Sequence, residues 1–326
     1  MKKIRPFFLL ICIMSFLLAG CSRNPQPISK SGIYFDTVIT ITVYDESHIP
    51  FLDECFVMAQ NYENLFSKSI ETSDVYKINH SNGLETVVNE ETFYLIEKSL
   101  SYAKFTDGAV DPTILPLSDL WNFGENQSVP DSLAIESALS LVGYPYVILD
   151  KENSSVTLNN KNMGIDLGFI AKGYIADKMK EYLLSEGVES ALINLGGNIL
   201  TIGSKPDGSP YILGVQEPFN DGISTIPNVS LTDKSLVTSG VYERCFYQDD
   251  VLYHHILDTN TGYPVNTGLW GVTILSDSSM EGDAYSTMCL CLGLTDGMKL
   301  IEQTDGMEAM FITEDMEIYY SSGFPK

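Results

Sequence analysis

The chain has few basic residues: 19 Lys and Arg stand against 43 Asp and Glu, giving a formal net charge of -24 at pH 7. A surface this acidic repels phosphate backbones and anionic lipid headgroups. The composition therefore argues against nucleic-acid binding. It also means that an anionic substrate must be met locally, by a metal ion, a single lysine or backbone N–H groups.

Cysteine is scarce as well, with six in the chain, of which Cys12 and Cys21 fall in an N-terminal segment discussed below. The others are Cys55, Cys245, Cys289 and Cys291. A disulfide between Cys289 and Cys291 would be strained on a helix, and both lie in an apolar run. We expect Cys289 and Cys291 to be small buried side chains rather than a redox or metal site.

Internal repeats, low-complexity segments and a regular β–α–β alternation are all missing. Their absence excludes a repeat protein and disfavours a doubly wound parallel sheet, so we predict an α+β fold. We expect helices at 51–66, 91–105, 132–141, 171–184 and 283–292, and a loop at 111–130 anchored by Trp121 and Phe123. We expect strands at 38–43, 146–149, 155–158, 190–194, 255–257, 271–275, 309–313 and 318–320, and near Leu200, Tyr211 and Leu236.

The N-terminus has the pattern of an export signal, with Lys2, Lys3 and Arg5 before an apolar run that ends in Leu18-Ala-Gly-Cys21. Small residues directly before a cysteine are typical of a lipoprotein cleavage site. A transmembrane helix is the alternative, but the run is shorter than the roughly 20 residues needed. We predict a signal peptide at 1–20, a lipid anchor on Cys21 with a tether at 21–31, and one domain at 32–326. The protein would then sit on the extracytoplasmic face of the cell membrane.

One crowded turn stands out, Asp166-Leu-Gly-Phe-Ile-Ala-Lys-Gly173, where an apolar run becomes a helix. A helix N-terminus offers backbone N–H groups and a positive dipole to an anion, and Lys172 adds a charge there. A helix cap and a surface salt bridge would explain the same residues without a site. The turn needs partners elsewhere to be functional.

A second stretch supplies such partners: Asp283-Ala-Tyr-Ser-Thr287 places a carboxylate and a hydroxyl four residues apart on one helical face. Two oxygen ligands on one turn suit Mg²⁺, which completes its shell with water and substrate phosphate. The structural alternative is an N-cap Asp283 and a Thr287 hydroxyl bonded to its own helix.

Two further stretches could serve either a structural or a catalytic role. Thr106-Asp-Gly-Ala-Val-Asp-Pro-Thr113 has the residues of a tight turn. Tyr253-His-His-Ile-Leu-Asp-Thr-Asn-Thr-Gly-Tyr-Pro264 contains two of the four histidines of the chain. Zinc-motif spacing is missing there, so we favour general acid–base catalysis by His255 over metal binding, with plain packing as the alternative.

The order of the motifs, rather than any one of them, resembles the ApbE family of FAD:protein FMN transferases. The resemblance runs from about Ile33 to the last strands and rests on seven motifs: Phe35-Asp-Thr-Val-Ile-Thr-Ile-Thr-Val-Tyr44, Gly108-Ala-Val-Asp-Pro-Thr with Leu120-Trp-Asn-Phe-Gly124, Asp166-Leu-Gly-Phe-Ile-Ala-Lys-Gly-Tyr174, Asn194-Leu-Gly-Gly-Asn198, Thr238-Ser-Gly-Val-Tyr242, His255-Ile-Leu-Asp with Thr261-Gly-Tyr-Pro264, and Asp283-Ala-Tyr-Ser-Thr287.

This resemblance implies a two-lobed α+β domain that encloses FAD and uses Mg²⁺. The implied metal ligands are the carbonyl of Phe169 and the side chains of Asp283 and Thr287. The implied FAD contacts are Phe35, Ala109, Val110, Asp111, Asp166, Lys172 and Ile256. Mg²⁺ and Lys172 would neutralise the diphosphate while His255, with a pKa near neutrality, or else Asp166 takes a proton from the attacking hydroxyl.

The sequence departs from the family pattern at three positions. Phe169 replaces a commoner small residue, which a carbonyl ligand tolerates, and Val110 stands where Phe is usual. Ser69 falls where many members place a Tyr against the flavin, which leaves room for water.

Three functions follow from these residues. The first is transfer of FMN from FAD to a Thr or Ser hydroxyl of an exported or membrane flavoprotein, which releases AMP. The second, motivated by Ser69, is an FAD pyrophosphatase that gives FMN and AMP. The third is a lipoprotein that binds flavin without catalysis, and it leaves Asp283, Thr287 and His255 without a purpose.

Overall fold

The computed structural model describes residues 25–124, 127–220 and 225–325. The predicted signal peptide at 1–20 and Cys21 lie outside the described residues. Within the described part, no helix is both long and apolar enough to span a bilayer.

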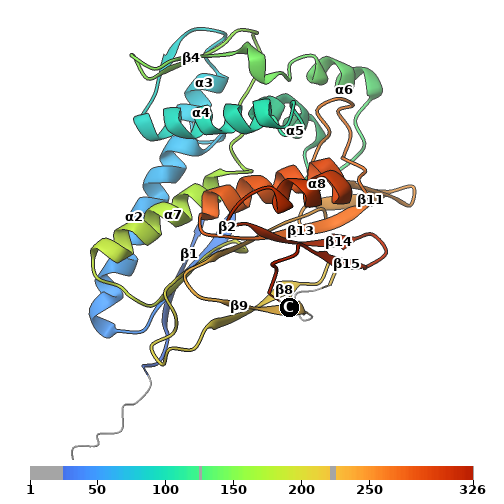
Figure 1. Cartoon of the computed structure of the whole chain (residues 1–326). Coiled ribbons are helices and arrows are strands. Elements are labelled where there is room, and N and C mark those ends of the chain that lie inside the picture. The colour runs from blue at the N-terminus through green and yellow to red at the C-terminus, as the bar shows by residue number, and fades with distance from the viewer. Residues whose placement is uncertain (1–24, 125–126, 221–224, 326) are drawn as a thin grey trace, which may run out of the picture.

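The centre of the fold is an eight-stranded sheet in which every neighbouring pair is antiparallel (Figure 1). Its strands, in spatial order, are β1 (Ile28–Tyr34), β2 (Thr37–Val43), β6 (Ala191–Leu195), β7 (Asn198–Ile202), β10 (Ser235–Gly240), β13 (Leu269–Ser276), β14 (Glu308–Thr313) and β15 (Ile318–Tyr320). The antiparallel sheet confirms the predicted α+β class and excludes a doubly wound fold.

Three smaller sheets accompany the large one: β3 (Thr86–Val87) with β5 (Ser155–Leu158) and β4 (Val147–Asp150), the hairpin β8 (Tyr211–Gln216) and β9 (Thr225–Leu231), and the hairpin β11 (Cys245–Gln248) and β12 (Val251–His254). The α-helices are α2 (Ile49–Phe66), α3 (Asp74–Asn79), α4 (Glu90–Phe105), α5 (Leu115–Trp121), α6 (Ser132–Leu139), α7 (Ala171–Ser185) and α8 (Ser279–Glu302). Short 3₁₀ turns lie at Glu46–His48, Pro112–Ile114 and Tyr144–Tyr146.

Strand β2 forms because its residues alternate between threonine and branched apolar side chains. Ile39, Ile41 and Val43 are fully buried on one face. On the other face the threonine hydroxyls pair with serines of β1, for example Thr42 with Ser29 at 2.8 Å. The half-buried strand expected from the alternation is confirmed.

Both faces of the large sheet are covered. Along β14, Ala309 and Phe311 pack in the core beneath α8, whereas Met310 and Ile312 pack against the β8–β9 hairpin on the opposite face. Figure 1 shows α7 and α8 side by side over the sheet and the β8–β9 hairpin beneath it. Helices α4, α5 and α6 and the small β3–β5–β4 sheet form a further layer above them.

Two sequence predictions about secondary structure are wrong. The stretch 111–130 is not mostly loop, because Pro116 stands in the first turn of α5, where a missing N–H costs nothing. Residues 255–257 are not a strand: β12 ends at His254, and Leu257 makes only an isolated bridge to Pro264.

Other predictions hold or need extension. Trp121 is buried as an anchor, with 1% of its surface exposed. Helix α8 begins four residues before Asp283 and continues past Leu292 through a break at Gly293, where φ is +79° and ψ 175°. Strand β1 begins at Ile28, so the sheet includes four residues assigned by sequence to the tether.

Cys289 and Cys291 pack in or against the core, as predicted. All four within the described residues are free thiols, and Cys55 and Cys289 are fully buried. Burial raises the pKa of both to about 12, so neither thiol ionises at neutral pH.

Candidate active site

The candidate site lies at one end of the strands of the large sheet. Two tight turns and a strand end meet two helix N-termini there. The turns are Phe35-Asp36 between β1 and β2, and Gly196-Gly197 between β6 and β7. Both residues of each turn have positive φ. Such hairpins usually carry Gly or Asn, so Phe35 at +53° holds a strained backbone angle, as residues at functional sites often do.

Asp283 lies in the second turn of α8, and its side chain is almost fully buried. The helix is capped by Ser278, so the alternative of Asp283 as an N-cap is wrong. The N–H of Gly173, from the start of α7, donates to Asp283 Oδ2 at 2.9 Å. Burial raises the pKa of Asp283, while Lys172 and the Gly173 N–H oppose the shift by favouring the carboxylate.

Thr287 lies one turn further along α8, as its spacing predicts. Its Oγ1 lies 3.0 Å from Ser239 Oγ at the end of β10, and Ser239 Oγ in turn lies 2.7 Å from Ser286 Oγ. The contact to Ser239 accounts for the Thr287 hydroxyl better than a bond to its own helix. The hydroxyl is therefore held at a fixed position on the face that carries Asp283.

The carbonyl of Phe169 lacks the partner that a helix would give it. Gly173, four residues later, sends its N–H to Asp283 instead, and no other backbone N–H in the described part of the chain donates to Phe169 O. Helix α7 also has no side-chain cap at Ile170. One free carbonyl, one carboxylate and one hydroxyl make a set of hard oxygen donors, which fits Mg²⁺.

Asn198 is a member of the site that sequence reasoning did not assign a role. Its Oδ1 accepts the Ser279 hydroxyl at 2.5 Å. Its Nδ2 is buried and makes no hydrogen bond of normal geometry within the described residues, but it acts on Asp283 as a dipole that favours the charged form. The sequence signal was the Asn-Leu-Gly-Gly-Asn motif, whose last residue begins β7.

Lys172 is the shared cation of the site. Its charge acts on Asp283, on Glu243 and on His255, so the structure brings these four side chains together. Glu243 was not predicted by sequence; its pKa is raised by desolvation and by Asp283 and lowered by Lys172. Its side chain is exposed.

His255 does not have the near-neutral pKa expected from sequence. Desolvation is the largest cause, followed by the charges of Arg244, His254 and Lys172, and together they lower its pKa to about 4. Its Nδ1 faces the Arg244 carbonyl at 3.3 Å. A carbonyl accepts, so we assign the proton to Nδ1, and Nε2 is left with a free lone pair.

Asp166 is held by a residue that the sequence analysis missed. Its Oδ1 accepts the Gly168 N–H at 2.8 Å, and its Oδ2 pairs with Lys68 at 3.2 Å. Lys68 also pairs with Asp119 of α5 at 3.0 Å. The turn is thus tied to the layer of helices above it, and a surface lysine next to Ser69 gave no sequence signal for this role.

The remaining predicted flavin contacts divide into buried and accessible groups. Val110 and Ile256 are buried in the core, with 5% and 7% of their surfaces exposed, whereas Phe35 and Ala109 are half-buried. Asp111 behaves as turn chemistry predicts: its Oδ1 accepts the N–H and hydroxyl of Thr113, and its Oδ2 accepts the Tyr144 N–H at 2.7 Å.

The motif after His255 is a structural loop. Asp258 Oδ1 accepts the Asn260 N–H at 2.8 Å, and the Thr259 hydroxyl donates to Gly108 O at 2.6 Å. Gly262, at φ +75°, packs so closely that an added Cβ would lie 2.7 Å from an Ile135 methyl. The loop therefore joins the neighbourhood of His255 to the Gly108 turn and to α6.

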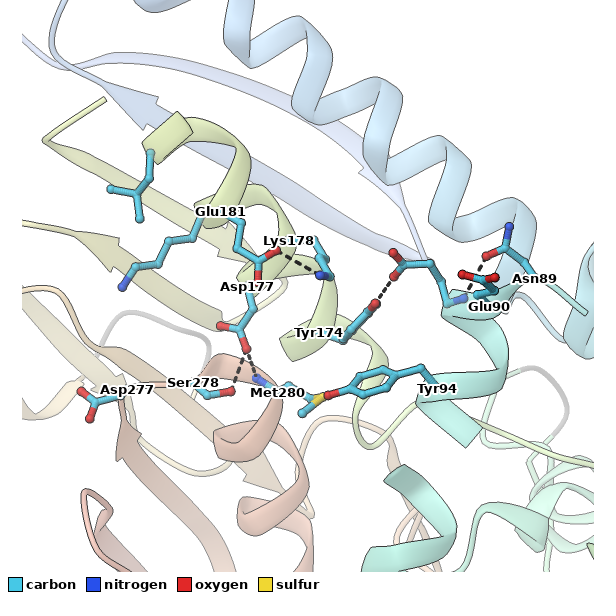
Figure 2. Close-up of a pocket in the computed structure, with 13 residues that line it drawn as sticks. Asn89, Glu90, Tyr94, Tyr174, Asp177, Lys178, Glu181, Asp277, Ser278 and Met280 are labelled. Atoms are coloured by element: carbon cyan, nitrogen blue, oxygen red, sulfur yellow. Dashed lines mark hydrogen bonds and ion pairs between the residues drawn. The ribbon is translucent and has the colours of Figure 1, made fainter. Parts of the chain in front are cut away.

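Other metal or ligand sites are not evident nearby. The described residues contain no cluster of three or more His, Cys, Asp or Glu side chains that would bind a metal. A cavity of about 730 Å³ lies elsewhere, between α4, α7 and the start of α8, and is lined by Glu91, Tyr94, Tyr174 and Asp177 among others (Figure 2).

Comparison with known proteins gives a consistent result. The sequence model of the ApbE family matches residues 35–311. An FAD:protein FMN transferase of Klebsiella pneumoniae is 37% identical over 296 residues, which cover 90% of this chain and 92% of the relative. One of Treponema pallidum is 32% identical, covering 96% of this chain and 92% of the relative.

Solved structures agree with the sequence relatives. The crystal structure of the ApbE protein from Thermotoga maritima superposes with a TM-score of 0.84 at 34% identity, covering 91% of this chain and 97% of that one. The flavin transferase ApbE from Vibrio cholerae superposes with a TM-score of 0.82 at 26% identity, covering 92% and 98%.

Proposed function

This chain belongs to the ApbE family, and from that premise we propose that it is an FAD:protein FMN transferase that requires Mg²⁺. It moves FMN from FAD to a Thr or Ser hydroxyl of an acceptor flavoprotein and releases AMP. The observation that carries the proposal is the convergence of Asp283, Thr287, the free Phe169 carbonyl and Lys172 at one end of the strands of the sheet.

The reaction replaces the phosphoanhydride bond of FAD by a phosphoester bond to the acceptor. The acceptor oxygen bonds to the phosphorus on the flavin side of FAD, and the bond from that phosphorus to the bridging oxygen breaks, so that AMP leaves with the bridging oxygen. Bound Mg²⁺ supplies charge neutralisation of the diphosphate and a fixed orientation for its oxygens. Lys172 adds a second positive charge, and the N-terminus of α7 adds its dipole.

The hydroxyl proton needs an acceptor in the protein. His255 is neutral at pH 7, and its Nε2 lone pair is the one not directed at the Arg244 carbonyl. Nε2 of His255 accepts the proton of the attacking hydroxyl, and the Asp166 carboxylate is the second candidate for this role. Asp166 is the weaker candidate because its two oxygens already accept from Gly168 and Lys68.

The N-terminal sequence supports a location for the enzyme and a class of acceptor. A lipid on Cys21 holds the enzyme on the extracytoplasmic face of the cell membrane, where it meets an acceptor of a membrane or exported redox system. The nearest described strand, β1, begins seven residues after Cys21. A short tether of this kind keeps the site close to membrane-bound acceptors.

Hydrolysis of FAD is the alternative reaction of the same site. Ser69, which the resemblance places near the flavin, is exposed, and its N–H donates to the Ser67 hydroxyl at 3.1 Å. A small exposed side chain leaves space for water, which would take the place of the acceptor hydroxyl and give free FMN and AMP.

The test is transfer of FMN by the full-length chain in detergent micelles, incubated with FAD, Mg²⁺ and a flavin-acceptor domain. We expect the acceptor to gain the mass of one FMN, with one AMP released per transfer. Asp283→Ala should lower the rate roughly 100-fold or more, because it removes a metal ligand. Asp296→Ala, an exposed position later on α8, is the matched control and should leave the rate unchanged.

The other outcomes separate the hypotheses. Metal-dependent AMP release without any labelled acceptor would establish the pyrophosphatase instead. Release of no AMP by the wild-type chain, with FAD still bound, would leave a flavin-binding lipoprotein and refute an enzyme.

A further inference from the structure

Helices α7 and α8 together carry the candidate metal site, although they lie about 100 residues apart in the chain. Phe169 and Lys172 stand at the start of α7, and Asp283 and Thr287 stand on α8. A metal site requires its ligands to be fixed within a few tenths of an ångström. The relative position of these two helices is therefore a requirement of the chemistry.

Asp177 of α7 binds the beginning of α8 with both carboxylate oxygens. Oδ1 accepts the Ser279 N–H at 2.8 Å, while Oδ2 accepts the Ser278 hydroxyl at 2.7 Å and the Met280 N–H at 3.0 Å. Figure 2 shows the carboxylate pointing down onto this end of α8, at one side of the cavity. Helix α8 also has its own cap, because Ser278 Oγ accepts the Glu281 N–H. Asp177 thus satisfies N–H groups beyond those that the cap satisfies.

The contact runs in both directions between the two helices. Gly173 and Asp177 lie four residues apart on one face of α7, and Ser279 and Asp283 lie four residues apart on one face of α8. An α7 N–H, from Gly173, binds the α8 carboxylate of Asp283, and an α7 carboxylate, from Asp177, binds α8 N–H groups. Two crossed contacts of this kind fix how each helix is rotated about its axis and how far it is shifted along the other.

The helices also touch too closely at this point for either to slide. A Cβ added to Gly173 would lie 2.2 Å from the Ser279 carbonyl oxygen. Without Asp177, the Ser279 and Met280 N–H groups would have no acceptor at this contact, and α8 would turn to find one. Such a turn would carry Asp283 and Thr287 away from the Phe169 carbonyl.

We propose that Asp177 is a positioning residue for the metal site: by holding the first turn of α8, it sets the register that places Asp283 and Thr287 opposite the turn of α7. The inference rests on the proposed function, because it takes Mg²⁺ as the ion held there. Asp177 does not contact the metal. Its effect is on metal affinity, transmitted through the backbone of α8.

The test measures metal binding directly. Mn²⁺ replaces Mg²⁺, and its binding to the full-length chain in micelles with FAD present is followed by loss of the free-ion electron paramagnetic resonance signal. In Asp177→Asn we expect the Kd for Mn²⁺ to rise roughly 10- to 100-fold. The Mg²⁺ concentration for half-maximal activity should rise in parallel, while the rate at saturating Mg²⁺ recovers to within a few-fold of wild type.

Asp74→Asn is the matched control for lost capping. Asp74 is buried, and its Oδ2 accepts the Asn89 N–H at 2.8 Å and the Thr92 hydroxyl at 3.0 Å at the start of α4. The two variants remove a similar cap, so we expect similar losses of thermal stability. Only Asp177→Asn should weaken metal binding.

A milder variant covers the case in which Asp177→Asn does not fold. Ser278→Ala removes one of the three bonds to Asp177 together with the side-chain cap on the Glu281 N–H, and we expect it to weaken Mn²⁺ binding about threefold. An unchanged Mn²⁺ affinity in folded Asp177→Asn, or in Ser278→Ala, would overturn the inference. An equal loss of Mn²⁺ affinity in Asp74→Asn would also overturn it. A wild-type chain that binds no Mn²⁺ would instead refute the metal site of the proposed function.

Discussion

His254 and His255 are adjacent in sequence but face different surroundings. His254 is buried, its Nε2 lies 3.1 Å from the Val265 carbonyl, and its Nδ1 has no partner among the described residues. His255 is more accessible and faces Lys172 and Arg244. Desolvation lowers the pKa of each to about 4, so both are neutral at physiological pH. The two rings are therefore open to separate tests, one of catalysis and one of stability.

The pH dependence of catalysis should report His255. The acid limb of kcat/KM reflects the free enzyme. With the pKa of His255 lowered to about 4, we expect kcat/KM for FMN transfer to stay level between pH 8 and about 5.5 and to fall only below that. His255→Gln should lower the plateau roughly 100-fold. An acid limb centred near the ordinary histidine pKa of about 6.5 would contradict this assignment.

The pH dependence of stability should report both histidines, and a substitution of His254 isolates its share. Its pKa is lowered on folding, so between about pH 6.5 and 4 the unfolded chain binds a proton that the folded chain does not. Stability is therefore lost as pH falls through this window. Between pH 8 and pH 5 the loss from His254 amounts to about 2 kcal/mol, and His255, whose pKa is lowered to the same value, adds a similar loss. Urea unfolding at the two pH values should show this loss reduced in His254→Gln, whose amide can donate to Val265 in place of Nε2; an equal loss in both would exclude His254 as the source.

Residues of the site differ in how far sequence could predict them. Helical spacing places Asp283 and Thr287 on one face, but their predicted roles, and that of Lys172, rested on the resemblance to the family. Asn198 and Glu243 could not be assigned, because their roles depend on a close approach of β7, β10 and α8 that no local pattern encodes. The pKa of His255 was mispredicted for the same reason: its cause is desolvation by segments distant in sequence.

At the scale of secondary structure, the contact between α7 and α8 depends on one glycine. Gly173→Ala should separate the helices, because its Cβ would lie 2.2 Å from the Ser279 carbonyl oxygen. We expect a loss of about 2 kcal/mol or more in the free energy of unfolding, measured with urea. Gly271→Ala, where the nearest atom lies at 3.6 Å, is the control and should cost less than about 1 kcal/mol. Equal effects of the two changes would show that the contact is not tight.

Local patterns predicted most elements but not all of their ends. The start of α7 at Ala171 agrees with the prediction. The start of α8 was placed four residues late, since Asp283 looks like a cap while the cap is Ser278. Its predicted end at Leu292 coincides with the break at Gly293, after which a second helical segment continues. The loop predicted at 111–130 missed the helix that begins at Leu115, although proline, here Pro116, favours a first turn.

At the scale of the whole molecule, the layers are tied together near the site by Trp121 of α5. Its indole N–H donates to the Gly262 carbonyl at 2.8 Å, in the loop that follows His255. Trp121→Phe leaves this buried carbonyl without its donor, so we expect a loss of about 1–3 kcal/mol in unfolding free energy and faster amide exchange at Gly262. Trp270→Phe, the other tryptophan, should leave exchange at Gly262 unchanged; unchanged exchange in Trp121→Phe itself would contradict the role.

The class of the fold was predictable, but its strand order was not. Irregular alternation of strands and helices indicated an α+β domain, which the antiparallel sheet confirms. The pairing of β2 with β6, about 150 residues later, is decided by burial on both faces of the sheet rather than by any motif. The β11–β12 hairpin was missed because its turn, Asp249-Asp250, carries no glycine.

The hydrogen bond from Gly173 to Asp283 spans 110 residues of chain. During synthesis, the turn that contains Lys172 is translated well before Asp283, whose carboxylate completes the candidate site. Because closing so long a loop is slow and costs entropy, the candidate metal site cannot assemble until nearly all of the polypeptide has been synthesised. A product cut short by a premature stop codon before Asp283 would keep the lysine and lose the carboxylate, so an unfinished chain gains no catalytic activity.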